Sequence, residues 1–91
     1  RVASKFIVRR NPELVELSTS LQTARQVTVD NNARLTSISF SGLEEVLERL
    51  DVNNNGVKVL DTFHELKSVG YGIMISENKH LNEIKGFEKI K

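Results

Sequence analysis

Residues 73–84 read IMISENKHLNEI, and the same phrase occurs three more times in the chain. The other copies are FIVRRNPELVEL at residues 6–17, VTVDNNARLTSI at 27–38 and LDVNNNGVKVL at 50–60. Each copy has two apolar residues around a variable one, then an asparagine, then a second apolar pair. The first apolar positions are 6, 27, 50 and 73, so successive copies are 21, 23 and 23 residues apart. A fixed period of this length is typical of a solenoid, in which each coil buries its inner face against its neighbours.

The start of each copy predicts a short strand. Two apolar residues flank a variable one there, which matches the period of two that puts alternate side chains on one face of a strand. Because each strand is reached by a connection of similar length, we expect the strands to stack in parallel. The repeat thus predicts a β-rich solenoid, a right-handed parallel β-helix of the leucine-rich-repeat kind. It would form one domain over residues 1–91, with about four coils of 21–23 residues. The expected inward residues are Phe6, Val8, Val27, Val29, Leu50, Val52, Ile73 and Ile75.

An asparagine follows each predicted strand at a constant place, three residues after the second inward residue. A single asparagine in a loop is usually a turn former. Four at one phase of a repeat indicate a ladder, in which each side-chain amide satisfies backbone groups where the strand bends into the loop. We therefore predict a structural asparagine ladder of Asn11, Asn32, Asn55 and Asn78.

The rest of each coil supplies two more apolar faces and is expected to include short helical return segments. The second face consists of Leu14, Leu17, Leu35, Ile38, Val57, Leu60, Leu81 and Ile84. The third aligns Leu21, Leu43, Phe63 and Phe87, followed by Ala24, Val46, Leu66 and Ile90. Residues 41–50, SGLEEVLERL, have a serine N-cap candidate, early acids and apolar residues at helical spacing, so we expect a helix there. A second, shorter helical turn is expected over residues 61–67.

The composition limits the possible classes of function. The 91-residue chain has a net charge of +1 and no cysteine. A charge this close to zero gives no reason to expect a nucleic-acid partner or an anionic membrane. No apolar run approaches the ~20 residues that span a bilayer, so we expect no direct membrane insertion. The chain begins at Arg1 without a signal-peptide pattern, and we expect it to be a fragment of a longer repeat domain.

Two stretches resemble the receptor L-domain family, the leucine-rich-repeat-like β-helices of insulin- and EGF-receptor ectodomains. They are LKSVGYGIMISENKHLNEIKGFEKIK at residues 66–91 and VTVDNNARLTSISFSGLEEV at 27–46. A coil of that family similarly runs Val-Gly, strand, two residues, Asn, two residues, Leu-x-x-Ile, then Gly-Phe or Gly-Leu. The resemblance covers residues 6–90 and implies a right-handed solenoid in a cell-surface or secreted protein. Family members usually carry cysteine-bearing ends and glycosylation sequons, which this chain lacks.

No pattern of residues predicts catalysis. The serines and threonines occur without a nucleophile elbow, and no glycine loop opens a helix that would hold a phosphate. His64 and His80 each lack a second histidine at a metal-binding spacing. We therefore predict a protein that is not an enzyme, with no catalytic residue, metal site or cofactor.

Residues 51–62 contain a partial calcium-loop pattern. The residues that match positions one, three, five and six of an EF-hand loop are Asp51, Asn53, Asn55 and Gly56. Lys58 replaces the apolar residue at position eight, and Thr62 replaces the carboxylate at position twelve. An EF-hand-like calcium-binding protein with two helices is therefore a lesser alternative.

The outward side chains of the strands are the best candidate for a binding surface, because solenoids use such extended faces for recognition. The leading prediction is a recognition module of a cell-surface or secreted protein that presents its parallel β face to a protein ligand. The alternative is a structural solenoid of a cell wall or matrix with no specific ligand. The candidate ligand-binding residues are Ile7, Arg9, Thr28, Asp30, Asp51, Asn53, Met74 and Ser76.

The two ends of the predicted stack show no polar capping segment. The coils of Phe6 and Phe87 would each leave one inner face without a neighbour. Unpaired strand edges and apolar end faces favour association with another chain. We therefore also expect self-association through the open ends of the solenoid.

Overall fold

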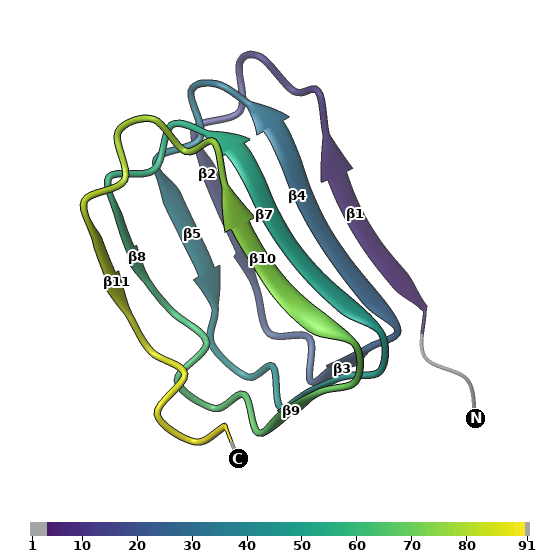
Figure 1. The fold of residues 1–91 in the computed structure, drawn as a ribbon. Coiled ribbons are helices and arrows are strands. Elements are labelled where there is room, and N and C mark those ends of the chain that lie inside the picture. The colour runs from purple at the N-terminus through teal and green to yellow at the C-terminus, as the bar shows by residue number, and fades with distance from the viewer. Residues whose placement is uncertain (1–3, 91) are drawn as a thin grey trace.

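The computed structural model describes residues 4–90, and all the regular structure in them is β-strand. The chain winds through four coils, each of which contributes one strand to a long parallel sheet (Figure 1). In spatial order the sheet holds β1 (Lys5–Arg9), β4 (Gln26–Asn32), β7 (Arg49–Asn55) and β10 (Gly72–Ser76). The predicted parallel β-solenoid of about four coils is confirmed.

Neighbouring strands of the long sheet pair at the predicted phase of the repeat. Val8 lies beside Val29, Val29 beside Val52, and Val52 beside Ile75. Val29 and Val52 are fully buried, since each has a coil on both sides. Because equivalent residues of the repeat lie beside each other, valine and isoleucine side chains fill the inner side of the sheet. This side is closed to water, and β-branched residues are favoured in such strands.

The other two sides of the solenoid carry shorter strands, all of them parallel, and within residues 4–90 the fourth coil adds none to the third side. On the second side, two separate pairs form: β2 (Glu16–Thr19) with β5 (Ser37–Phe40), and β8 (Val59–Asp61) with β11 (Glu83–Lys85). On the third side, one three-stranded sheet contains β3 (Thr23–Ala24), β6 (Glu45–Val46) and β9 (Ser68–Val69). The gap between β5 and β8 is bridged by the buried hydroxyl of Thr62, which accepts a hydrogen bond from the backbone N–H of Phe40 at 2.7 Å.

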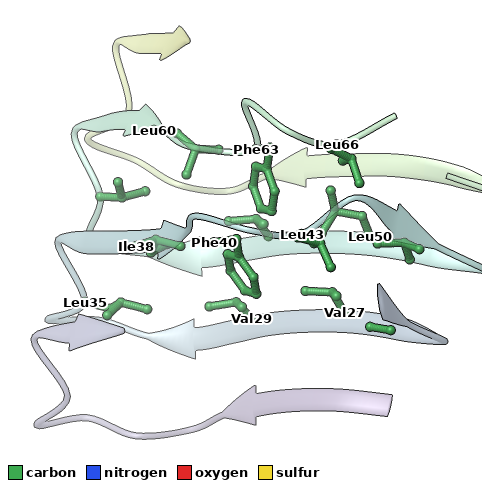
Figure 2. Packing of buried hydrophobic residues seen from close by; sticks show 14 residues of the cluster. Val27, Val29, Leu35, Ile38, Phe40, Leu43, Leu50, Leu60, Phe63 and Leu66 are labelled. Carbon is green, nitrogen blue, oxygen red and sulfur yellow. The ribbon is translucent and has the colours of Figure 1, made fainter. Parts of the chain in front are cut away.

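The core lies between these three sides and includes a stack of aromatic rings (Figure 2). The rings of Phe40 and Phe63 stack with centroids 5.0 Å apart, and those of Phe63 and Phe87 with centroids 5.3 Å apart. Phe6 meets Phe40 edge to face at 5.5 Å. This stack corrects the predicted third apolar face, which aligned Leu43 with Phe63 and left Phe40 out. The third copy is one residue shorter before the second face and recovers that residue at Phe63, where φ is 63°.

The predicted helices are not formed, because residues 4–90 contain no helix. Residues 41–50 instead run through a corner, β6 and the start of β7. Leu43, Val46 and Leu50 are fully buried there, whereas Leu47 is exposed. The backbone N–H of Glu44 donates to the preceding coil rather than back along its own chain. Apolar residues three and four apart fit the corners of a coil as well as a helix face, so the spacing was ambiguous. Residues 61–67 make only a single turn.

No helix in the described part of the chain is long and apolar enough to cross a membrane. The two helices that an EF-hand needs are absent over the same residues. Asp51 and Asn53 point outward from β7, whereas the side chain of Asn55 lies inside the ladder, so these oxygens cannot surround one ion. Among residues 4–90 no cluster of three histidine or acidic side chains is placed to hold a metal.

The four ladder asparagines line the corner where the long sheet ends. Three side-chain amides donate to an inward residue's carbonyl in the preceding coil: Asn32 to Val8 (3.1 Å), Asn55 to Val29 (3.0 Å) and Asn78 to Val52 (2.9 Å). The same amides join each other, since Asn32 Nδ2 donates to Asn55 Oδ1 at 3.0 Å. The first position differs. Asn11 Nδ2 donates to the carbonyl of Arg9 in its own coil at 2.9 Å, because residues 4–90 provide no earlier coil.

Candidate recognition face

The outward side chains of the long sheet form three rows across the coils, which together we call the outer face. The first row contains Lys5, Gln26, Arg49 and Gly72. The central row contains Ile7, Thr28, Asp51 and Met74. The last row contains Arg9, Asp30, Asn53 and Ser76. The structure therefore brings all eight candidate ligand-binding residues into two adjacent rows.

The central row is apolar and open at its ends but polar and covered in its middle. Ile7 and Met74 are 49% and 51% exposed, whereas Thr28 and Asp51 are each only 9% exposed. The first row supplies the cover. Gln26 Nε2 donates to Thr28 Oγ1 at 3.0 Å, and Arg49 Nε lies 4.0 Å from Asp51 Oδ1.

Asp51 is the anomaly of the outer face. Its Oδ1 is the one buried side-chain oxygen or nitrogen in residues 4–90 without a hydrogen-bond partner. The 4.0 Å separation from Arg49 Nε is too long for a hydrogen bond. Leaving a buried polar atom unpaired costs about 1–3 kcal/mol of folding free energy. The outer face therefore holds one carboxylate whose bonding is incomplete in the isolated chain.

The last row is held in place by its own contacts. Arg9 and Asp30 form an ion pair across the first two coils at 3.4 Å. Asn53 Oδ1 accepts hydrogen bonds from Ser76 Oγ at 2.8 Å and from the Ser76 backbone N–H at 3.1 Å. These side chains are thus oriented before any partner arrives.

Sequence reasoning did not select Gln26 and Arg49 as site residues. Both precede a candidate residue by two positions, so the strand period carries the information that they flank it. It could not reveal that their side chains bend over the central row.

A second polar group lies away from the outer face and was not expected. His64 Nε2 lies 2.7 Å from Asp61 Oδ1, and its Nδ1 lies 2.9 Å from Glu88 Oε2. Hydrogen bonds to Glu88 and then to Asp61 raise the pKa of His64 above 6.5. The two carboxylates occupy opposite sides of the ring, so the three groups link the third and fourth coils and do not converge on a metal ion.

The asparagine corner also contains a shallow notch of about 260 Å³. It opens where the third copy of the repeat is one residue shorter, beside Gly56. A Cβ on Gly56 would lie 2.4 Å from the carbonyl oxygen of Ala33. The lining residues are Asn31, Ala33, Asn54, Asn55, Gly56, Glu77, Lys79 and His80. These groups have mixed charge and single out no class of ligand.

No protein-family model, curated protein or solved structure matches this chain. The resemblance to receptor L domains therefore rests on the repeat residues alone and stays a prediction.

Proposed function

We propose that this chain is a non-enzymatic recognition module of a cell-surface or secreted protein and binds a protein partner through its outer face. The observation that carries the proposal is Asp51, a buried carboxylate with an unpartnered oxygen at the middle of that face. A partner that presses Arg49 onto this carboxylate completes its hydrogen bonding and recovers free energy that the isolated chain lacks. The cell-surface setting rests on the family resemblance.

The side chains of the central row indicate which surface chemistry a partner would need. Ile7 and Met74 offer half-exposed apolar side chains on either side of Asp51. A matching surface would place apolar side chains at both ends of the row and a group that presses on Arg49 between them. The backbone under the outer face is fixed by the hydrogen bonds of the parallel sheet. Little backbone conformational entropy is therefore lost when the outer face binds a partner.

The size of the outer face limits the affinity. Four strands at the ~4.8 Å spacing of a sheet make the face only about 15 Å wide between the outer strands. Such a patch covers a few hundred Å², below the ~800 Å² per partner of a standard interface. We therefore expect a weak, rapidly exchanging complex, unless the partner also reaches beyond the outer face.

A matched pair of variants tests the proposal. Purified chain is measured by surface plasmon resonance against a panel of extracellular domains, and any binder is then measured with Met74→Glu and Val59→Glu. The two residues have similar exposure, 51% and 42%, but Val59 lies on the second side of the solenoid. We expect Met74→Glu to weaken binding at least about tenfold, as for an interface residue, and Val59→Glu to leave it unchanged. Equal binding by both variants would overturn this choice of face.

A further inference from the structure

Asn55 and Gly56 form the only Asn-Gly pair in the sequence, and Asn55 lies in the middle of the asparagine ladder. The residues that follow the other ladder asparagines are Pro12, Ala33 and Lys79. An asparagine side chain can be attacked by the backbone nitrogen of the next residue. A following glycine favours this attack because it has no side chain to hinder the approach, whereas a proline prevents it because its nitrogen carries no hydrogen. Asn55 therefore differs from the other ladder positions in its chemistry, although it shares their structural role.

The reaction at this pair is a deamidation and needs no reagent except water. The backbone nitrogen of Gly56 bonds to Cγ of Asn55 and loses its hydrogen, the Cγ–Nδ2 bond breaks, and ammonia leaves with that hydrogen. The product is a cyclic succinimide. Water then opens the ring at one of its two carbonyl carbons, which leaves aspartate or isoaspartate at position 55.

The folded chain holds the reacting amide away from its attacker. The leaving nitrogen, Asn55 Nδ2, donates to the carbonyl of Val29 at 3.0 Å and to Asn78 Oδ1 at 3.3 Å. Asn55 Oδ1 accepts from Asn32 Nδ2 at 3.0 Å, and Asn55 is only 4% exposed. These contacts direct the amide toward the preceding coil. The side chain can turn back onto its own backbone only when the ladder opens and several hydrogen bonds break together.

The fold also requires the glycine that makes Asn55 reactive. A Cβ at position 56 would lie 2.4 Å from the carbonyl oxygen of Ala33 in the preceding coil. The obstacle is backbone, so a side chain at this position would push the two coils apart. Gly56 thus allows close packing in the folded chain and leaves Asn55 open to attack in the unfolded chain.

The products of the reaction do not fit the ladder. In an aspartate at position 55, an acceptor oxygen would replace Nδ2 and face two other acceptors, the carbonyl of Val29 and Oδ1 of Asn78. The carboxylate would also bring an unpaired charge into a buried site, which strongly destabilises a fold. An isoaspartate adds a carbon to the backbone and breaks the register of β7. A chain modified at Asn55 therefore loses the means to rebuild its ladder.

We propose that Asn55 is a one-way modification site, closed to deamidation while the ladder is formed and open to it when the third coil unfolds. A chain that stays unfolded is thereby marked and does not return to the native fold. Asn55 has a coil on both sides in the described part of the chain. The site does not depend on the proposed function.

Peptide mapping by mass spectrometry measures the conversion of Asn55. The full 91-residue chain is incubated at mildly alkaline pH in native buffer and in guanidinium chloride, beside a synthetic peptide of residues 52–58. We expect the denatured chain to convert as fast as the peptide. The native chain should convert at least about a hundredfold more slowly, because its open state has a population on the order of 10⁻³ or less. Equal rates in both solutions, or an unreactive Asn55 in denaturant, would overturn the proposal.

A matched pair of variants tests whether the ladder supplies the protection. Asn78→Ala removes the acceptor of two Asn55 hydrogen bonds and keeps the Asn-Gly pair, so Asn55 should convert at least about tenfold faster in native buffer. Asn11→Ala, at a ladder position that does not contact Asn55, should convert at close to the wild-type rate. If circular dichroism shows that Asn78→Ala is unfolded, the wild-type comparison decides. A folded Asn78→Ala that converts no faster than Asn11→Ala would overturn the role of the ladder.

Refolding tests whether the modification acts in one direction. Wild-type chain that is partly converted in guanidinium chloride is diluted into native buffer, and its folded fraction is isolated by size exclusion. We expect this fraction to retain asparagine at position 55, with aspartate and isoaspartate confined to the unfolded fraction. The same proportion of converted residue in both fractions would overturn the one-way site.

Discussion

The second and third coils of this solenoid use the same repeat as the first and fourth but bury it very differently. Val27, Val29, Leu50 and Val52 are fully buried in β4 and β7, whereas Ile73 in β10 is 41% exposed. The ladder shows the same contrast, since Asn55 is buried with partners in both neighbouring coils and Asn11 is exposed. Burial in a stacked repeat therefore depends on the neighbouring coils as much as on the residue.

The largest expected difference between the two regions concerns the apolar interior. Leu50→Ala removes a fully buried side chain between two coils and should lower the free energy of unfolding by about 3 kcal/mol. Ile73→Ala, at the paired position in β10, should lower it by only about 1 kcal/mol, because part of this side chain is already in water. Urea denaturation of both variants at low protein concentration measures the difference. Equal losses would show that the end coil is covered in solution.

The asparagine ladder allows the same comparison of a central coil with an end coil for a polar side chain. Asn55→Ala leaves the carbonyl of Val29 and the amide of Asn32 without their partner inside the molecule, so we expect a loss of about 2–3 kcal/mol. Asn11→Ala should cost less than about 1 kcal/mol, because its groups can bond to water instead. The same urea experiment checks both values. A loss at Asn11 as large as that at Asn55 would contradict the account of the first rung.

Asp51 lies in a central coil, but its substitution should stabilise the chain, whereas substitution of Leu50 or Asn55 should destabilise it. Asp51→Thr repeats the residue of the adjacent rung, Thr28, and removes a buried carboxylate oxygen that lacks a hydrogen bond, so it should raise the free energy of unfolding by about 1 kcal/mol. Asp30→Thr, which instead removes an ion pair with Arg9, is the control and should lower it by no more than about 0.5 kcal/mol. If Asp51→Thr destabilises the chain, Asp51 is satisfied in solution and the proposal for the outer face loses its support.

The smallest expected effect concerns the exposed contact that ties the fourth coil to the third. Glu88 and Asp61 raise the pKa of His64 above 6.5, so the stability contributed by His64 is complete below that pH and is lost as the pH rises through the raised pKa. His64 lowers the pKa of Glu88 below 4.5, so the contribution of Glu88 is present above that pH and is lost as the pH falls through the lowered pKa. The contact is therefore strongest between these two limits.

The measurement is the urea midpoint of wild type minus that of His64→Gln, followed from about pH 5.5 to about pH 8.5. We expect this difference to shrink toward the alkaline end. A difference that stays constant would mean that the ring does not bridge the two coils in solution. His80→Gln serves as the control, since that ring lies in the notch and not in the bridge.

Sequence reasoning found the strands of the long sheet and their register because the repeat states them four times. The outer face followed directly, since side chains alternate along a strand. It did not find the burial of Asp51 or the bridge of His64 to Glu88. Each of these features depends on one residue type that does not recur at the equivalent position of the other coils. The repeat pattern therefore could not predict it. The aromatic stack was misaligned for a related reason, because two length changes within the third coil cancel.

The sequence by itself determined that this chain stacks four similar coils. Apolar residues recur in it at the strand period, and an asparagine follows them at a constant place, and few folds other than a solenoid bury both sets of side chains. Only the tertiary structure decided that the return segments are extended, since bonds between coils satisfy their backbone where a helix would use its own. It also decided which copies of the repeat are covered. A side chain loses its contact with water only when another coil lies against it, and that is a property of the stack.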